Sequence, residues 1–130
     1  MPDKFKAVVI NNQHEKFSHE IKEINISDLK DGNVLVKVDY SSLNYKDAMI
    51  LKDGGRIVSK FPFGTGMDFS GTVVESEDEK FKKDDSVILT GFRVGEIFFG
   101  GFSQYAKVDS NFLIKTPKEL NNQKAMMLGT

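Results

Sequence analysis

The sequence predicts a mainly β domain with short helices. Apolar and β-branched residues alternate with polar residues over short runs, and clusters of Gly, Asp and Asn interrupt these runs at short intervals. Within residues 33–40, Val34, Val36 and Val38 fall on one face, as in a strand with one buried side. With 130 residues, the chain has the length of one ordinary domain built around a single hydrophobic core.

Seven strands are expected along the chain. The patterns FKAVVI and FSHEIKEI predict the first two, and the turn sequence KDGN precedes the third. Four further runs, FSGTVVE, SVILT, FSQYAKV and FLIK, contain β-branched or aromatic residues typical of strands. The expected strands are Phe5–Ile10, Phe17–Ile24, Asn33–Tyr40, Phe69–Glu75, Ser86–Thr90, Phe102–Val108 and Phe112–Lys115.

Two segments do not follow the strand pattern. Residues 75–85 (ESEDEKFKKDD) are so highly charged that they predict a solvated loop, with Phe81 pointing inward. After Pro117, residues 118–128 indicate the start of a helix that ends on the apolar run AMML. Such a short helix has little stability alone, so we expect a truncated longer chain; the natural end of one small domain is the alternative.

Charge and composition argue against several classes of function. The formal net charge of −1, from 18 Lys+Arg and 19 Asp+Glu, gives no global field to hold nucleic acid or an anionic membrane. No apolar run approaches the ~20 residues of a membrane span, and the N-terminus lacks a secretory signal, so a cytoplasmic protein is expected. The absence of cysteine excludes disulfides, thiolate catalysis and cysteine-ligated zinc.

The first candidate site segment is SSLNYKDAMI, which follows the third expected strand. Ser41 or Ser42 is expected to cap a short helix there. Asn44 and Asp47 lie three residues apart and share a face of that helix, with Tyr45 next to them. Two polar groups on one face indicate a site; a capped helix with a solvated outer face is the alternative.

The second candidate segment is KFPFGTGMDFSGTV. Gly64 and Gly66 suggest a phosphate loop, but Phe69 stands where the third glycine would be and a strand follows instead of a helix, so we reject that interpretation. The turn instead places Gly66 and Asp68 at the start of a strand. Gly71, within that strand, allows another backbone to approach closely. An aspartate between apolar neighbours predicts a carboxylate that is either paired or functional.

The third candidate segment is LTGFRVGEIFFGG, which combines four glycines with Arg93 and Glu96. It is too apolar for an ordinary exposed loop. The alternative is a flexible turn with a surface pair between Arg93 and Glu96, worth at most about 1 kcal/mol.

Four segments, in their order and spacing, resemble the N-terminal half of the medium-chain dehydrogenase/reductase superfamily: SSLNYKDAM, FPFGTGMDFSGTV, LTGFRVGEIFFGGFSQYAKV and AMMLGT. They look most like its zinc-free YhdH/AcuI group of NADPH-dependent quinone-oxidoreductase-like and acrylyl-CoA reductases. The resemblance covers residues 5–130, and N-Y-K-D with L-T-G-x-x-V-G-E is its most specific part.

This resemblance implies a GroES-like catalytic domain, a partly open β-barrel that forms one wall of a cleft, over residues 1–117. Residues 118–130 would begin the connecting helix to a Rossmann domain, which would hold most of the NADPH. The superfamily commonly makes homodimers, often through that second domain.

The resemblance also implies roles for residues at the corner. Asn44, Tyr45 and Asp47 match the strand–helix corner beside the nicotinamide. There Tyr45 would donate a hydrogen bond or relay a proton, Asn44 would fix the nicotinamide face or a carbonyl, and Asp47 would order both.

Further matches extend the implied site. Gly66 and Asp68 match the family's G-x-D turn, Asp68 on the cofactor side and Gly66 in the cleft. Arg93 and Glu96 fall on the V-G-E loop, where ordering of the cleft or substrate contact is expected. Thr130 matches the threonine that opens the cofactor-binding half.

The implied reaction reduces an activated C=C bond of an enoyl-CoA such as acrylyl-CoA, or a quinone. It requires a held hydride donor, a polarised carbonyl and a proton source. Zinc is not needed, and cysteine ligands are absent; the only histidines, His14 and His19, lie away from the motifs.

Two other hypotheses remain beside the reductase. The chain is alternatively a non-catalytic β-barrel binding module, since fold alone does not confer function, or an inactive fragment. Reading the coding sequence beyond Thr130 separates them, because a glycine-rich βαβ unit supports the reductase.

Overall fold

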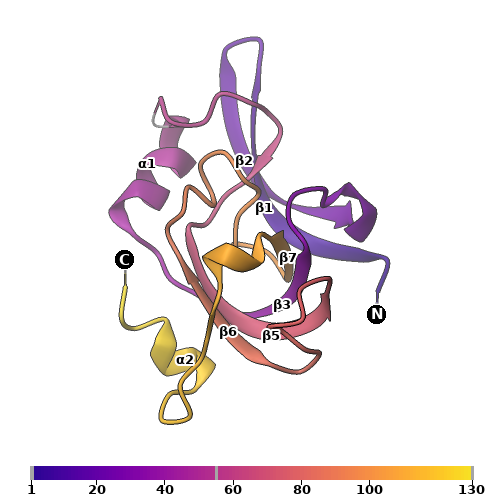
Figure 1. The fold of residues 1–130 in the computed structure, drawn as a ribbon. Helices are drawn as coiled ribbons and strands as arrows, with labels where there is room; N and C mark the ends of the chain where they lie inside the picture. The colour runs from indigo at the N-terminus through magenta and orange to yellow at the C-terminus, as the bar shows by residue number, and fades with distance from the viewer. Residues whose placement is uncertain (1, 55, 130) are drawn as a thin grey trace.

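The strands form two antiparallel sheets with short helices at their periphery (Figure 1). The computed structural model describes residues 2–54 and 56–129. The mainly β fold with short helices that the sequence predicts is therefore confirmed. None of the helices in these two ranges is long and apolar enough to cross a membrane.

The first sheet is built on a long hairpin. Strands β1 (Lys4–Gln13) and β2 (Lys16–Asn25) pair over their full length, and β4 (Phe63–Gly64) pairs with the other side of β1. The turn residues His14 and Glu15 have φ of 53° and 64°, as in the two-residue turns that match the twist of a hairpin. Both expected strands are confirmed and extended at each end.

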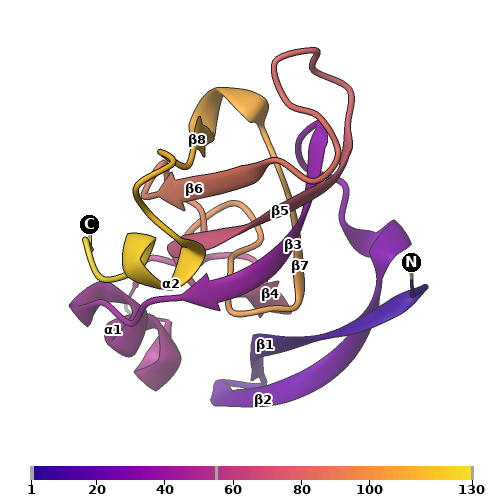
Figure 2. The same cartoon turned by 90° about the horizontal axis from the view of Figure 1, so that it is seen from below.

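The second sheet has the order β7-β3-β5-β6-β8 (Figure 2). Its apolar face forms the main core, in which Val36, Phe69 and Leu89 are completely buried. Gly71 lies so close to β3 that a Cβ there would collide with the carbonyl oxygen of Lys37, which confirms the expected close approach. The strands are β3 (Val34–Ser41), β5 (Asp68–Ser76), β6 (Ser86–Thr90), β7 (Tyr105–Val108) and β8 (Ile114–Lys115).

The two sheets meet near the middle of β1. The amide of Val8 donates to the carbonyl of Phe102 (2.7 Å), and Ala7 forms an isolated bridge with Ser103. The sheets do not join into one closed barrel within residues 2–54 and 56–129.

Two predicted strands are too long. Residues 102–104 bond to other segments instead of entering β7, because Phe102 donates to Thr65. Residues 110–112 form the 3₁₀ helix η2 (Ser110–Phe112), capped by the side chain of Asp109, so only the last part of that predicted strand remains. The charged segment begins after β5 ends at Ser76, and Phe81 is buried as expected.

The helices begin later than predicted. Helix α1 (Tyr45–Asp53) has Asn44 as its N-cap, so capping by Ser41 or Ser42 is wrong. Near the C-terminus, helix α2 (Asn122–Ala125) covers only part of residues 118–128. The side chain of its N-cap, Asn121, accepts from the amide of Lys124 (2.8 Å), which fixes the late start. A 3₁₀ helix, η1 (Ile26–Asp28), follows β2.

Side-chain bonds hold α2 on the second sheet. The Ser70 hydroxyl donates to the carbonyl of Asn122 (2.6 Å), and the Asn122 carboxamide donates to Asp39 (2.8 Å). Ala125 and Met126 pack against Ile88, whereas Met127 and Leu128 remain exposed.

Candidate active site at the start of helix α1

Two buried carboxylates lie at the corner between β3 and α1. Asp47 and Asp68 are both completely buried, and the carboxamide of Asn44 donates to both, at 3.3 Å and 3.0 Å. Because a buried carboxylate without donors is costly, this shared donor explains how two acidic side chains are accommodated together. Asn44 and Asp47 do cap the helix, as the capped-helix alternative expects, but the Asp47 side chain lies on the buried side of the helix and not on its solvated face.

Asp47 caps its own helix and also fixes a neighbouring turn. Its Oδ2 accepts from the backbone amide of Asn44 (2.9 Å), which forms a reciprocal capping box. Its Oδ1 accepts from the amide of Met67 (3.1 Å). Burial raises the pKa of the Asp47 carboxyl above its ordinary value of 3.8, the bonds from Asn44 and Met67 oppose the rise, and the charge of Asp68 adds to it.

Asp68 connects three segments that are distant in sequence. Its Oδ2 accepts from Ser42 (3.3 Å) and Asn44 (3.0 Å), and its Oδ1 accepts from the amide of Gly91 (3.1 Å). The expectation that Asp68 is paired is confirmed. The corner, the turn before β5 and the loop after β6 therefore meet at this one carboxylate, as the three candidate segments suggested.

Tyr45 stands apart from this buried network. It is the first residue of α1 and is 83% exposed. Within the two described ranges its hydroxyl has no hydrogen-bond partner. Tyr45 thus begins a helix whose N-cap belongs to the buried network, and its exposed side chain is accessible to a ligand.

The loop after β6 is tied to α1 by an ion pair that the sequence analysis missed. Lys46 Nζ lies 2.6 Å from Glu96 Oε1, and Arg93 Nε lies 3.6 Å from the other oxygen. The Arg93–Glu96 pair of the alternative interpretation is therefore present, but its glutamate is only 9% exposed and lies closer to Lys46 than to Arg93. The sequence contained one signal for the Lys46–Glu96 pair: a lysine in N-Y-K-D and a glutamate in V-G-E, two motifs that were assigned to the same candidate site.

Backbone contacts fix the same loop. The amides of Gly100, Gly101 and Phe102 donate to the carbonyls of residues 64–66, at 2.8, 2.8 and 2.9 Å. Gly95 has φ of 79°, and a Cβ there would lie 2.6 Å from the backbone of Gly66. The flexible-turn interpretation of this segment is therefore wrong, and its glycines serve close packing of two backbones.

The glycine turn before β5 is not built as a phosphate-binding loop. Gly64 and Gly66 lead directly into β5, so this turn offers no helix N-terminus to a phosphate, as expected. A carboxamide and an exposed phenol lie at the corner instead. Thr130 lies outside the described residues.

No group of three or more His, Cys, Asp or Glu suited to a metal ion is found in residues 2–54 and 56–129. His14 lies in the β1–β2 turn and His19 in β2, away from the buried network.

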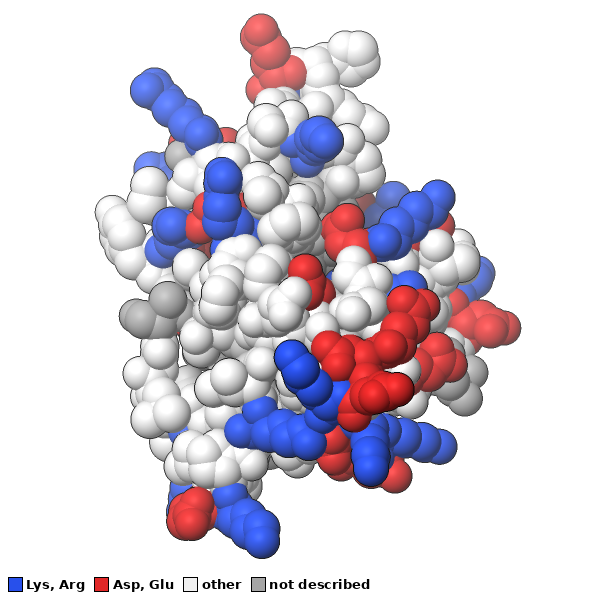
Figure 3. Space-filling view, viewed as in Figure 1, with Lys and Arg blue, Asp and Glu red and all other residues white. Residues whose placement is uncertain are grey.

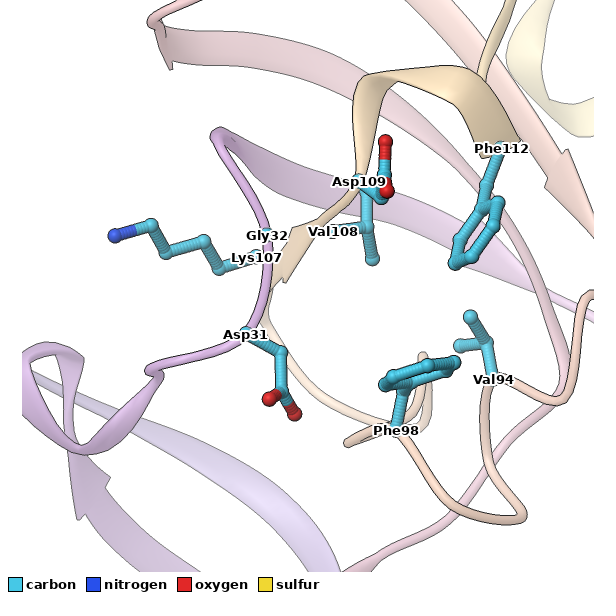
Figure 4. Close-up of a pocket in the computed structure, with 8 residues that line it drawn as sticks. All are labelled: Asp31, Gly32, Val94, Phe98, Lys107, Val108, Asp109 and Phe112. Carbon is cyan, nitrogen blue, oxygen red and sulfur yellow. The ribbon is translucent and has the colours of Figure 1, made fainter.

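A small pocket lies away from the corner, at the edge of the main core (Figure 4). Val94, Phe98 and Phe112 face one another across it, and Lys107 points away. It measures about 120 Å³, below the ~300 Å³ at which ligand pockets usually begin. It contains none of the predicted site residues.

The chain is similar to an acrylyl-CoA reductase and to two proteins whose crystal structures contain a bound nicotinamide cofactor. Acrylyl-CoA reductase AcuI of Ruegeria pomeroyi is 43% identical over 128 residues, which are 97% of this chain and 39% of that protein. The crystal structure of Escherichia coli K-12 YhdH with bound NADPH has 40% identity and a TM-score of 0.91, over 95% of this chain and 38% of that one. The structure of Bacillus subtilis yhfP with NAD bound has 38% identity and a TM-score of 0.93, over 98% and 39%.

The chain thus spans about two fifths of the length of these relatives. The alcohol dehydrogenase GroES-like domain model matches residues 30–118, well over half of the sequence, and the chain belongs to that family.

Proposed function

We propose that the chain is the catalytic domain of an NADPH-dependent reductase that acts, without zinc, on the activated C=C bond of an enoyl-CoA such as acrylyl-CoA, or on a quinone. The observation that carries the proposal is the corner itself, where an accessible phenol is held on a buried polar network. The similarity to the acrylyl-CoA reductase of Ruegeria supports acrylyl-CoA as the substrate, and the NADPH bound in the Escherichia structure supports NADPH as the cofactor.

The residues of the corner would divide the work. Tyr45 would donate a hydrogen bond or a proton to the substrate, because its side chain is exposed and carries a hydroxyl. Asn44 would orient the nicotinamide face; the N–H groups of its carboxamide already donate to Asp47 and Asp68, so they would not be the donors to a carbonyl. Asp47 and Asp68 would position Asn44 and the first turn of α1, which carries Tyr45, since their oxygens already accept hydrogen bonds there. NADPH would supply the hydride when bound.

Other residues would shape the cleft. Gly66 would place the turn that holds Asp68, and the loop that carries Arg93 and Glu96 would form a wall. Thr130 would contribute to the cofactor site, with most of the NADPH held by a Rossmann domain after residues 118–130. The partner is a small molecule, and a homodimer through the second domain is part of the proposal.

The test uses the complete reductase that contains this chain. NADPH oxidation is followed with acrylyl-CoA and with a quinone, with and without a zinc chelator, and NADPH binding is measured for the complete protein and for residues 1–130. We expect turnover that survives the chelator, and binding by the 130-residue chain weaker than about 10 μM. Loss of turnover with the chelator would contradict the zinc-free mechanism, and absence of turnover on both substrates would favour a binding module or an inactive fragment.

A further inference from the structure

Strand β2 forms a free edge of the first sheet. In the part of the chain that the structure describes, β2 pairs with β1 only, and Figure 2 shows its outer side at the margin of the molecule. Residues 18–23 are exposed on both faces, and Ile21 at their centre is 72% exposed. The outer edge of such a strand presents backbone N–H and C=O groups that can pair with another strand.

The order of side chains along β2 is complementary to itself. If two copies of β2 run antiparallel with Ile21 facing Ile21, then Glu20 of each copy faces Lys22 of the other. His19 likewise faces Glu23. The opposite charges of Glu20 and Lys22 directly across an antiparallel pair are favourable, and the two-fold symmetry makes this pair occur twice.

Other registers are less favourable. Every second residue of an edge strand points its backbone groups outward, so paired residues must be an even number of positions apart. A shift that centres the pair on Glu20 sets two glutamates against each other, and one centred on Lys22 sets two lysines against each other. Charges on an edge strand usually discourage pairing; here their order favours one register.

We propose that β2 is a self-association surface, through which two copies of the chain pair edge to edge about Ile21. One strand pair buries little surface, so the dimer is weak, with a Kd on the order of 0.1–1 mM. This surface lies on the hairpin that projects in Figure 1. It includes none of the residues of the candidate active site and does not depend on the proposed function.

The first test is sedimentation of the 130-residue chain from about 10 μM to 1 mM. We expect the mean mass to rise from 14.6 kDa towards twice that value. Glu20→Lys or Lys22→Glu should each weaken the dimer about tenfold, because like charges then face each other twice. The double variant Glu20→Lys, Lys22→Glu should restore wild-type association. A wild-type chain that stays monomeric at about 1 mM, or a double variant as weak as the single ones, would overturn the proposal.

The second test uses the absence of cysteine in the natural chain. In the proposed dimer the two copies of residue 21 have Cα atoms about 5 Å apart, within the range of a disulfide. Ile21→Cys should therefore form a covalent dimer under mild oxidation. In the control Ser18→Cys the two introduced thiols lie about 20 Å apart, and little dimer should form. Equal cross-linking of both variants would show random collision and refute the register.

Discussion

Lys46 Nζ lies 2.6 Å from Glu96 Oε1, so an ion pair joins the first turn of α1 to the loop after β6. The lysine side chain is 45% exposed and the glutamate only 10%. The glutamate therefore depends more on the pair than the lysine does. Removal of the lysine leaves a nearly buried carboxylate whose remaining ion-pair partner among the described residues is the more distant Arg93.

Lys46→Met should lower the free energy of unfolding by about 1 kcal/mol, a value reduced from that of a fully buried pair because solvent reaches the lysine. Urea denaturation measures it. Lys52→Met, on an exposed position of the same helix, is the matched control and should change little. Equal effects of the two variants would show that the pair with Glu96 contributes nothing.

Asp47→Asn should change how stability depends on pH. The folded-state pKa of Asp47 lies above 3.8, so the folded chain keeps this proton to higher pH than the unfolded chain does. The contribution of Asp47 to stability therefore falls as pH rises from about 3.8 through its folded pKa. The variant also replaces an acceptor with a donor opposite the amide of Asn44, a constant cost of about 1–3 kcal/mol.

Urea denaturation at several pH values from 3.5 to 7.5 measures the unfolding free energy of both proteins. The excess of the wild type over Asp47→Asn should be largest at the acid end and should decrease towards neutral pH. Asp84→Asn, at an exposed residue with φ of 76° that asparagine tolerates, is the control. A difference that grows with pH would contradict the raised pKa.

Ser110→Ala should destabilise the chain mainly at neutral pH. The hydroxyl of Ser110 donates to Asp78 at 2.6 Å, and this bond, followed by one from the amide of Lys80, lowers the pKa of Asp78. Such a carboxylate contributes stability above its unfolded pKa, and the contribution is lost as pH falls through the lower folded pKa. The destabilisation in thermal unfolding should shrink between pH 5 and pH 2, whereas the exposed control Ser59→Ala should be neutral throughout.

Tyr45→Phe should separate catalysis from stability. Because the hydroxyl is exposed and without a partner in the described residues, the free energy of unfolding of the chain should change by less than about 0.5 kcal/mol. In the complete reductase, kcat should fall on the order of 10²-fold, while the affinity for NADPH hardly changes. Single-turnover oxidation of NADPH beside equilibrium binding measures both; a wild-type rate on acrylyl-CoA and on a quinone would remove Tyr45 from the catalytic residues.

Local sequence patterns were sufficient to predict most of the strands and the mainly β fold. Alternation of apolar and polar residues located the long strands because each strand buries one face, and burial of Phe81 followed from its charged surroundings. Asn44 and Asp47 do lie together, as the three-residue spacing predicted, but Asn44 is the N-cap of α1 and not a residue on the face of the helix, which begins at Tyr45.

Long-range competition explains what was missed. Ser42 appeared to be a helix cap, but its hydroxyl donates to Asp68, and Asn44 takes the cap position because Asp47 caps it in return. The partner of Lys46 lies 50 residues away in Glu96. No local pattern reports such partners, because they depend on which loops the sheets bring together.

The stacking of residues 95–102 on residues 64–66 allows an outward side chain to be exchanged without moving the loop. Its position depends on main-chain hydrogen bonds and on glycine contacts, whereas Phe92, Arg93 and Ile97 are exposed. On the face of the molecule that Figure 3 shows, basic and acidic side chains are interspersed. Phe92 stacks on Phe112 and Arg93 pairs with Glu96, so diversification of Ile97 alone would vary what the loop touches on an unchanged scaffold, a natural starting point for altering specificity by directed evolution.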